Sequence, residues 1–181
     1  YVGVCRTIRD AAASHMPGRE DHAVEIPSMV DPREFDPDAR APVRAALGIP
    51  PDAPLIGWIG RLDRKKRVED FLRAAALVRA AEPAARFLVI GGPDAFMPEY
   101  EGELRALATT LGLADADGGA LRFLGDRPDI PRLLAALDAL AWLSRGEGMP
   151  HVIAEAGVAG LPVVATPDNG VLQQIADGRT G

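Results

Sequence analysis

The segment Glu147–Gly170, EGMPHVIAEAGVAGLPVVATPDNG, joins a loop, an apolar helix and a short strand. Pro150 suits the first turn of a helix, where its missing N–H costs nothing, and Gly160 marks the end, so we expect a helix over about 150–159. The apolar run Val163–Ala165 follows at once and has the character of a buried strand. The segment therefore predicts one repeat of an α/β sheet.

The same pattern extends toward the amino terminus. Short, nearly continuous apolar runs are typical of parallel strands that are covered on both faces. There are five of them: Leu55–Ile59, Phe87–Ile90, Leu121–Leu124, Ala139–Leu143 and Val163–Ala165. Helical periodicity fills most of the gaps, around 68–75, 100–111 and 130–137. This alternation predicts a doubly wound α/β fold, a parallel sheet with helices on both faces.

Residues 1–30 form a separate pattern: strand Val2–Cys5, a helix from about 7 to 14, and strand Ala23–Ile26. They are too few to bury a core, and DPREFDPDAR at 31–40 has the composition of a linker. We therefore expect a domain remnant with linker over 1–36 and the main domain over 37–181. A short helix is expected to start at Pro42. The first residue, inside a strand, and the last seven, IADGRTG, predict a chain cut from a longer one at both ends.

Composition and charge restrict the classes of protein to which this chain can belong. Hydrophobic residues make up 48% and charged residues 25% of the 181, which are globular values, and a net charge of -6 argues against a nucleic-acid surface. One cysteine, Cys5, excludes an internal disulfide and fits a cytoplasmic compartment, with peripheral membrane attachment left open. The apolar runs are too short to span a membrane. His15 and His22 lack companions at metal spacing, so no metal site is expected.

Glycine follows every predicted strand: Gly60, Gly91 with Gly92, Gly125, Gly146 with Gly148, and Gly170. In an open parallel sheet these turns meet at the carboxyl edge, where ligands bind. Glycine also allows the close backbone approach that a phosphate needs. No G-x-G-x-x-G follows the first strand and no G-x-x-x-x-G-K-S/T occurs, which disfavours dehydrogenases and P-loop ATPases.

Two acids flank the start of the helix at 150–159. Glu147 lies on the loop before it and Glu155 within it, and the unpaired N–H groups of Met149–Val152 point out between them as a site that suits phosphate. A sugar joined through a diphosphate to a ribose would fit this order of groups. In the alternative interpretation, Glu147 is a solvated loop acid and Glu155 is a neutralised or salt-bridged core residue. Spacing alone leaves both open.

The segment RLDRKKR at 61–67 brings cations to the start of the next helix, where they oppose the helix dipole. We interpret this as a helix start whose charge an external diphosphate would balance. Arg61 and Lys66 are the expected ligand-facing pair. The other cations, Arg64, Lys65 and Arg67, are expected to be solvated.

Three further residues have simpler interpretations. His151 could be a general base, but next to a proline at a helix start it is better read as a packing residue or backbone contact. Asp168 and Asn169 are expected to form the N-cap of the last helix.

Several of these segments together resemble one family. Gly60-Arg61 with Lys66, FLVIGGPD at 87–94, RFLGDRPDIPRLLAALDALAWLSRGEGMP at 122–150, and Glu147 with Glu155 followed by AGVAGLPVVAT resemble the carboxyl-terminal domain of GT-B-type glycosyltransferases of family 4. The resemblance implies one half of a GT-B fold, which binds a nucleoside-diphosphate sugar in a cleft between two Rossmann-like domains. It also implies transfer with retention of configuration, without a metal or a further cofactor.

The resemblance also implies roles for single residues. Arg61 and Lys66 look like the cations that neutralise the diphosphate and assist its departure, and Glu147 like the acid that faces the donor sugar. Gly148 and Met149 would hold sugar and phosphate, and Glu155 would bind the ribose. The rest of the expected donor-binding set is Gly60, Pro150 and Gly125, the last in the loop against the base.

The sequence departs from the family in two places. Arg67 replaces a usual glycine, and nearly all of the amino-terminal domain, with its acceptor site, is absent. PSMVD at 27–31 stands where the family often has PNGVD. We therefore expect that the full-length parent is a retaining hexosyltransferase using UDP- or GDP-sugar, and that this fragment binds donor weakly and transfers nothing. The alternatives are a nucleotide-sugar epimerase of related fold and a non-catalytic nucleotide-binding module. The sugar, base, acceptor and oligomeric state stay open.

Overall fold

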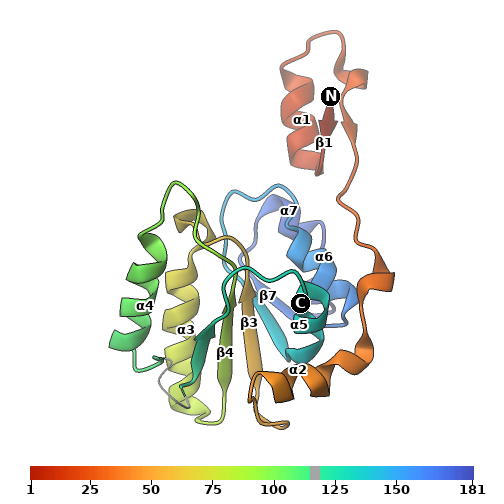
Figure 1. Cartoon of the computed structure of the whole chain (residues 1–181). Coiled ribbons are helices and arrows are strands. Elements are labelled where there is room, and N and C mark those ends of the chain that lie inside the picture. Colours follow the sequence, from red (N-terminus) through yellow and green to blue (C-terminus); the bar gives the residue numbers. More distant parts are fainter. Residues whose placement is uncertain (115–118) are drawn as a thin grey trace.

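A five-stranded parallel sheet with the strand order β5-β4-β3-β6-β7 forms the centre of the molecule, in a computed structural model that describes residues 1–114 and 119–181 (Figure 1). The strands are β3 Leu55–Ile59, β4 Arg86–Ile90, β5 Leu121–Phe123, β6 Ala139–Trp142 and β7 Val163–Ala165. All five predicted strands are confirmed. The order runs outward in both directions from β3, so it reverses between β3 and β6, which is where doubly wound sheets bind ligands.

Helices cover both faces of the sheet, as predicted (Figure 1). One face packs against α3 Val68–Ala81 and α4 Tyr100–Thr110. The other packs against α2 Arg40–Ala46, α5 Ile130–Ala136 and α6 His151–Val158, with the short α7 Asn169–Leu172 at its end. The remaining helical turns are 3-10 turns, η1 Glu20–His22, η2 Pro32–Glu34, η3 Pro37–Ala39 and η4 Arg64–Lys66.

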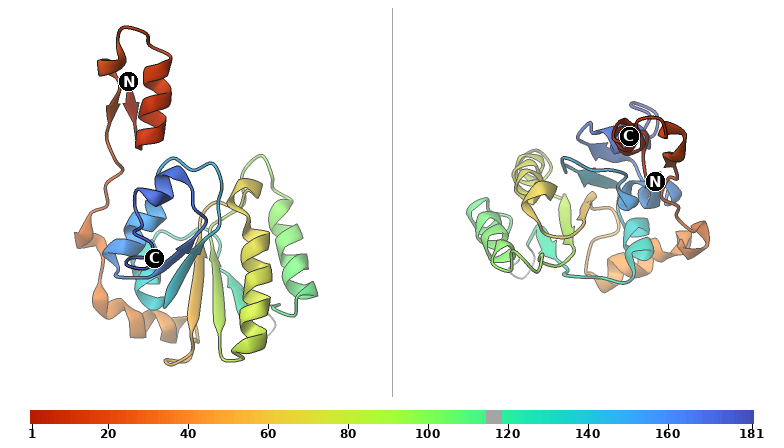
Figure 2. Two further views of the ribbon diagram at one scale, coloured as in Figure 1. Left: turned by 180° about the vertical axis from the view of Figure 1, so that it is seen from behind. Right: turned by 90° about the horizontal axis from the view of Figure 1, so that it is seen from above.

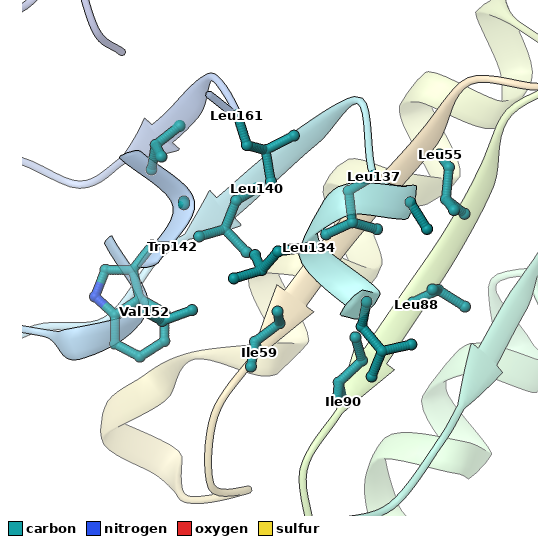
Figure 3. Packing of buried hydrophobic residues seen from close by; sticks show 14 of the residues in the cluster. Leu55, Ile59, Leu88, Ile90, Leu134, Leu137, Leu140, Trp142, Val152 and Leu161 are labelled. Carbon is teal, nitrogen blue, oxygen red and sulfur yellow. The ribbon is translucent and has the colours of Figure 1, made fainter. Parts of the chain in front are cut away.

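Two hydrophobic clusters, one on each face, hold the layers together. Figure 3 shows the first, which contains Leu137, just after α5, together with Leu55 of β3 and Leu88 of β4. Gly57 makes the close approach of Leu137 possible, because a Cβ on Gly57 would lie 2.3 Å from a methyl of Leu137. In the second cluster Phe71 of α3 meets Phe87 of β4 edge to face, with ring centroids 6.3 Å apart.

The linker region is more ordered than its composition suggests. Asp31 and Asp36 each cap a 3-10 turn by accepting a backbone N–H, and α2 begins at Arg40. The expected start at Pro42 is therefore wrong by two residues. A proline is tolerated there because the first-turn N–H groups of a helix have no partner within it.

Residues 1–26 form a small unit beyond the carboxyl edge of the sheet, near α7 (Figures 1 and 2). It consists of β1 Val2–Gly3, α1 Arg6–Ser14, η1 and β2 Val24–Glu25, with β1 and β2 paired in parallel. The first strand ends at Gly3, earlier than expected. Cys5 is the N-cap residue of α1 and is only 1% exposed. In the part of the chain that the structure describes, no helix is long and apolar enough to cross a membrane.

Candidate functional site

Glycines bring the turns after β3, β4 and β5 together at the carboxyl edge of the sheet. Gly91 has a φ of 136°, and a Cβ on it would lie 1.8 Å from the carbonyl oxygen of Gly60. The N–H of Gly91 donates to the carbonyl of Gly125 at 2.8 Å. Any side chain at position 91 would therefore force these turns apart. The backbones of these glycine turns therefore lie close together at the carboxyl edge of the sheet.

An ion pair joins the turn after β3 to the loop after β6. The Lys66 ammonium lies 2.6 Å from a carboxylate oxygen of Glu147, and the two side chains are only 18% and 17% exposed. The ammonium is also 5.0 Å from the ring centroid of Trp142, which stacks on Trp58 with centroids 6.2 Å apart. Lys66 thus lies between a carboxylate and an aromatic face, and both attract a cation.

Backbone contacts hold the two partners of this pair in place. Asp63 accepts the N–H of Lys65 with its carboxylate at 2.7 Å and that of Lys66 with its carbonyl at 3.0 Å. The N–H of Arg145 donates to the carbonyl of Lys65 at 3.1 Å, so the two loops are bonded directly. The Ser144 hydroxyl donates to the Glu147 carboxylate. Glu147 is therefore an ordered, largely buried acid, and the interpretation of it as a solvated loop acid is wrong.

Arg61 takes a different position from Lys66. Its guanidinium lies 3.0 Å from the Asp94 carboxylate, in the turn after β4, and 3.6 Å from that of Asp63. The Arg61 side chain is 63% exposed. Among residues 1–114 and 119–181, no ion pair connects Arg61 to Glu147. The structure thus brings Lys66 to the acid of the β6 loop and holds Arg61 beside the turn after β4.

The interpretation of α3 as a helix start with the wrong charge is not correct. Its first turn contains Glu69 and Asp70, which suit the positive end of the dipole. Arg67, with a left-handed φ of 53°, pairs with Asp70. Arg64 lies 2.9 Å from the Glu103 carboxylate. Arg64 and Arg67 are therefore paired rather than merely solvated.

The exposed Lys65 fits the expectation of solvation. The charge of the helix start therefore no longer supports the assignment of Arg61 and Lys66 to the ligand. That assignment depends on where the two side chains lie.

The loop before α6 presents free backbone donors. Pro150 is the N-cap residue, with a φ of -63° and a ψ of 120°, and α6 begins at His151, one residue after the expected start. Within the described residues, the N–H groups of Gly148 and Met149 bond to no acceptor of the protein. Together with the first turn of α6 they form a set of donors that suits an anion.

Glu155 is half-buried on α6. Burial raises its pKa, the nearby His151 counteracts this, and Glu34 raises the pKa further. Within the described part of the chain, no side chain or backbone group forms a hydrogen bond or ion pair with the Glu155 carboxylate. The salt-bridged alternative is therefore wrong. A half-buried carboxylate without a partner costs stability, and a ligand with donor groups would offset that cost.

The other expected site residues have simpler surroundings. His151 is exposed, so the expectation that it is a packing residue is wrong. Gly125 has a φ of 65°, and its carbonyl accepts the N–H of Gly91. Asp168 is the N-cap residue of α7 as predicted, whereas Asn169, expected to share the cap, is the first residue of the helix. Among the described residues, no group of three or more histidine, cysteine or acidic side chains is arranged to hold a metal.

Three contacts were not predicted: Asp94 with Arg61, Ser144 with Glu147, and the Asp168 carboxylate with the Glu147 N–H at 2.8 Å. The first and third join turns that are distant in the chain, and the second lies within the loop after β6. The one available indication was that Asp94, Ser144 and Asp168 all stand just after predicted strands, at the same edge of the sheet.

Comparison with known proteins gives a consistent set of matches. The profile of a family described as Glycosyl transferases group 1 matches residues 53–181. A D-inositol 3-phosphate glycosyltransferase of Stackebrandtia nassauensis is 34% identical over 167 residues, which is 89% of this chain and 37% of that protein. Another, from Corynebacterium urealyticum, is 38% identical over 142 residues, 76% of this chain and 32% of that protein. The chain thus spans about a third of the length of these relatives.

Solved structures match over most of the chain. Anabaena Alr3699/HepE in complex with UDP and glucose has a TM-score of 0.85 and 27% identity, over 98% of this chain and 47% of that one. The carboxyl-terminal domain of a group 1 family glycosyl transferase, LpcC of Francisella tularensis, has a TM-score of 0.70 and 28% identity, over 82% of this chain and 76% of that one.

Proposed function

Because the chain belongs to the group 1 glycosyl transferases, we propose that it is the donor-binding part of an enzyme that transfers a hexose from UDP- or GDP-hexose with retention of configuration. Its sheet is the Rossmann-like half of a GT-B fold. The acceptor and the second wall of the cleft would be supplied by a further domain. Neither a metal nor a further cofactor is part of the proposal.

The ion pair between Lys66 and Glu147 is the observation that carries this proposal. The Lys66 ammonium and the Glu147 carboxylate lie 2.6 Å apart, and Glu147 precedes the N–H groups of Gly148 and Met149, which have no acceptor among the described residues. Lys66 would bind phosphate. An ammonium has three donors, so Lys66 can stay paired with Glu147 and donate to a phosphate oxygen at the same time. Glu147 would accept hydrogen bonds from hydroxyls of the sugar.

The remaining roles are distributed along the same edge of the sheet. Arg61, whose side chain is 63% exposed, would turn from Asp94 and be the second cation on the diphosphate. Glu155 would accept hydrogen bonds from the ribose hydroxyls, since its carboxylate has no hydrogen-bond or ion-pair partner among residues 1–114 and 119–181. The backbone at Gly60, Pro150 and Gly125 would border the phosphates, the sugar and the base.

Catalysis would depend on the charge that gathers on the leaving diphosphate. As the bond between the sugar and the diphosphate breaks, negative charge grows on the phosphate oxygen, and cations already in place stabilise it more than they stabilise the intact donor. Lys66 is held in place by Glu147 and Trp142 before a ligand arrives. It therefore loses little freedom when it acts on the leaving group.

Calorimetric titration of the chain with UDP and with GDP tests the proposal. We expect one of them to bind, and Lys66→Met to weaken that binding about 10- to 100-fold, the value of a charge-assisted contact. Lys65→Met is the matched control, because its exposed side chain is the adjacent cation, and we expect no change above twofold. Absence of binding by the unmodified chain, or an equal loss in both variants, would refute the proposal and favour a non-catalytic interaction module.

A further inference from the structure

The loop after β7 packs along the loop after β6. The hydroxyl of Thr166 donates to the carbonyl of Ser144 at 2.6 Å. Gly170 approaches Gly148 so closely that a Cβ on Gly170 would lie 1.3 Å from the carbonyl oxygen of Gly148. These contacts lie on either side of Glu147. The loop after β7 therefore supports the backbone from which the Glu147 side chain projects.

Asp168 makes the central contact between the two loops. One carboxylate oxygen accepts the N–H of Glu147 at 2.8 Å and the other accepts that of Asn169 at 2.8 Å. Hydrogen bonds from the backbone of Glu147, Asn169 and Gly146 lower the pKa of Asp168, although partial burial opposes them. An ionised acceptor makes stronger hydrogen bonds than a neutral one. Capping the single turn of α7 requires only the bond to Asn169, so the bond to Glu147 calls for another explanation.

We propose that Asp168 is a positioning residue for the donor sugar: by holding the Glu147 N–H, it fixes the direction in which the Glu147 carboxylate meets the sugar hydroxyls. This inference rests on the proposed function. It assigns to Asp168 a second role besides the cap of α7, and it makes the loop after β7 part of the sugar site although its side chains need not touch the sugar.

The proposal predicts a selective effect, because each phosphate cation has at least one contact that does not depend on Asp168. Lys66 pairs with Glu147, but it is also fixed through its backbone by Asp63 and its ammonium lies over the Trp142 ring. Arg61 is held by Asp94. Loss of the Asp168 carboxylate should therefore weaken recognition of the sugar more than recognition of the diphosphate.

Binding of two matched ligands measures this selectivity. We expect Asp168→Ala to lower the affinity for UDP-glucose or GDP-mannose, whichever binds, at least tenfold, and the affinity for the corresponding UDP or GDP at most threefold. Asp168→Asn keeps one carbonyl acceptor, so its affinity for the sugar nucleotide should lie between those of the unmodified chain and Asp168→Ala. Asp177→Asn is the control, because it makes the same change of charge at an exposed acid of the same region.

Hydrogen exchange at the Glu147 amide gives a readout that needs no ligand. We expect this N–H to exchange at least tenfold faster in Asp168→Ala than in the Asp177→Asn control, with an intermediate rate in Asp168→Asn and unchanged exchange in β3 and β4. Unchanged exchange at Glu147, or an equal loss of affinity for sugar nucleotide and for nucleotide alone, would overturn the proposal. If the unmodified chain binds no nucleotide, the proposed function fails, while exchange still decides whether Asp168 holds the loop.

Discussion

Glu155 is a half-buried carboxylate to which the described chain offers no hydrogen-bond donor. Burial raises its pKa, and the nearby Glu34 adds to this, although His151 counteracts it. A native-state pKa above the unfolded value means that the folded protein keeps this proton longer as the pH rises. The ionised Glu155 therefore lowers the free energy of unfolding above the ordinary glutamate pKa, and that contribution vanishes in acid.

Glu155→Gln should separate stability from binding. We expect the variant to have a higher free energy of unfolding than the unmodified chain at pH 7, and the gain to disappear below about pH 4, where glutamate is neutral in both states. Nucleotide binding should fall about 10- to 100-fold, because a neutral amide replaces a charged acceptor of ribose hydroxyls. Urea unfolding at several pH values and calorimetric titration measure the two effects.

Glu34→Gln is the companion variant at this site. It removes the repelling charge but leaves the Glu155 carboxylate, so stability at pH 7 should rise slightly while binding is kept. A Glu155→Gln protein that binds nucleotide as tightly as the unmodified chain would remove Glu155 from the site.

At the scale of elements, a buried arginine ties α2 to the amino ends of the strands. Arg44 is 3% exposed and donates to the carbonyls of Ala136, Pro51 and Ala53 at 2.8 to 2.9 Å. It also pairs with Asp138 at 2.7 Å. Burial raises the pKa of Asp138, but hydrogen bonds from Arg40, the Leu55 N–H and Arg44 outweigh it, so the pKa lies below its ordinary value. This cluster lies opposite the candidate site and serves the fold.

Arg44→Met should therefore destabilise the chain without changing ligand contacts. We expect a loss of about 3 to 5 kcal/mol in urea unfolding, because several carbonyls and one carboxylate lose a buried partner. Arg40→Met is the control. Arg40 also pairs with Asp138, but its side chain is 43% exposed, so the loss should be about 1 kcal/mol. Equal losses of unfolding free energy in the two variants would contradict the view that the burial of Arg44 makes its contacts the stronger ones.

The strands were predictable from sequence for a physical reason. Residues of a parallel strand that is covered on both faces are nearly all apolar, so Leu55–Ile59 has the bounds predicted for it. Val163–Ala165 also has its predicted bounds, although Val164 in this edge strand is 65% exposed. Helix starts were less predictable. Local hydrogen bonds and tertiary contacts decide them, as the early start of α2 at Arg40 shows.

The contacts within the candidate site were the least predictable. Arg61 and Lys66 are separated by a single turn, yet one pairs with Asp94 and the other with Glu147. Charge pattern alone cannot choose between such partners, because the choice depends on how the turns after separate strands pack. Sequence singled out Glu155, since an acid on an otherwise apolar helix requires a special explanation, but it left open whether a protein group pairs with the carboxylate.

At the scale of the whole molecule, the small unit of residues 1–26 reaches the candidate site. A Cβ on Gly148 would lie 2.7 Å from the Cδ1 of Ile8 and 3.2 Å from the Cγ2 of Val4, so α1 and the segment before it lie over the loop that carries Glu147. Figures 1 and 2 show this unit otherwise apart from the sheet. Its position relative to α7 therefore sets how open this end of the site is.

Gln173 forms the polar part of that contact. Its carbonyl oxygen accepts the N–H of Arg6 at 2.9 Å, and its amide nitrogen donates to the Glu25 carboxylate at 2.9 Å. We expect Gln173→Ala to free the unit, so that limited proteolysis within 27–36 becomes about fivefold faster, which corresponds to about 1 kcal/mol for the lost hydrogen bonds. Gln174→Ala is the matched control, because that amide donates to Gly170 within its own turn. Equal cleavage rates in the two variants would contradict a role of Gln173 in holding the unit in place.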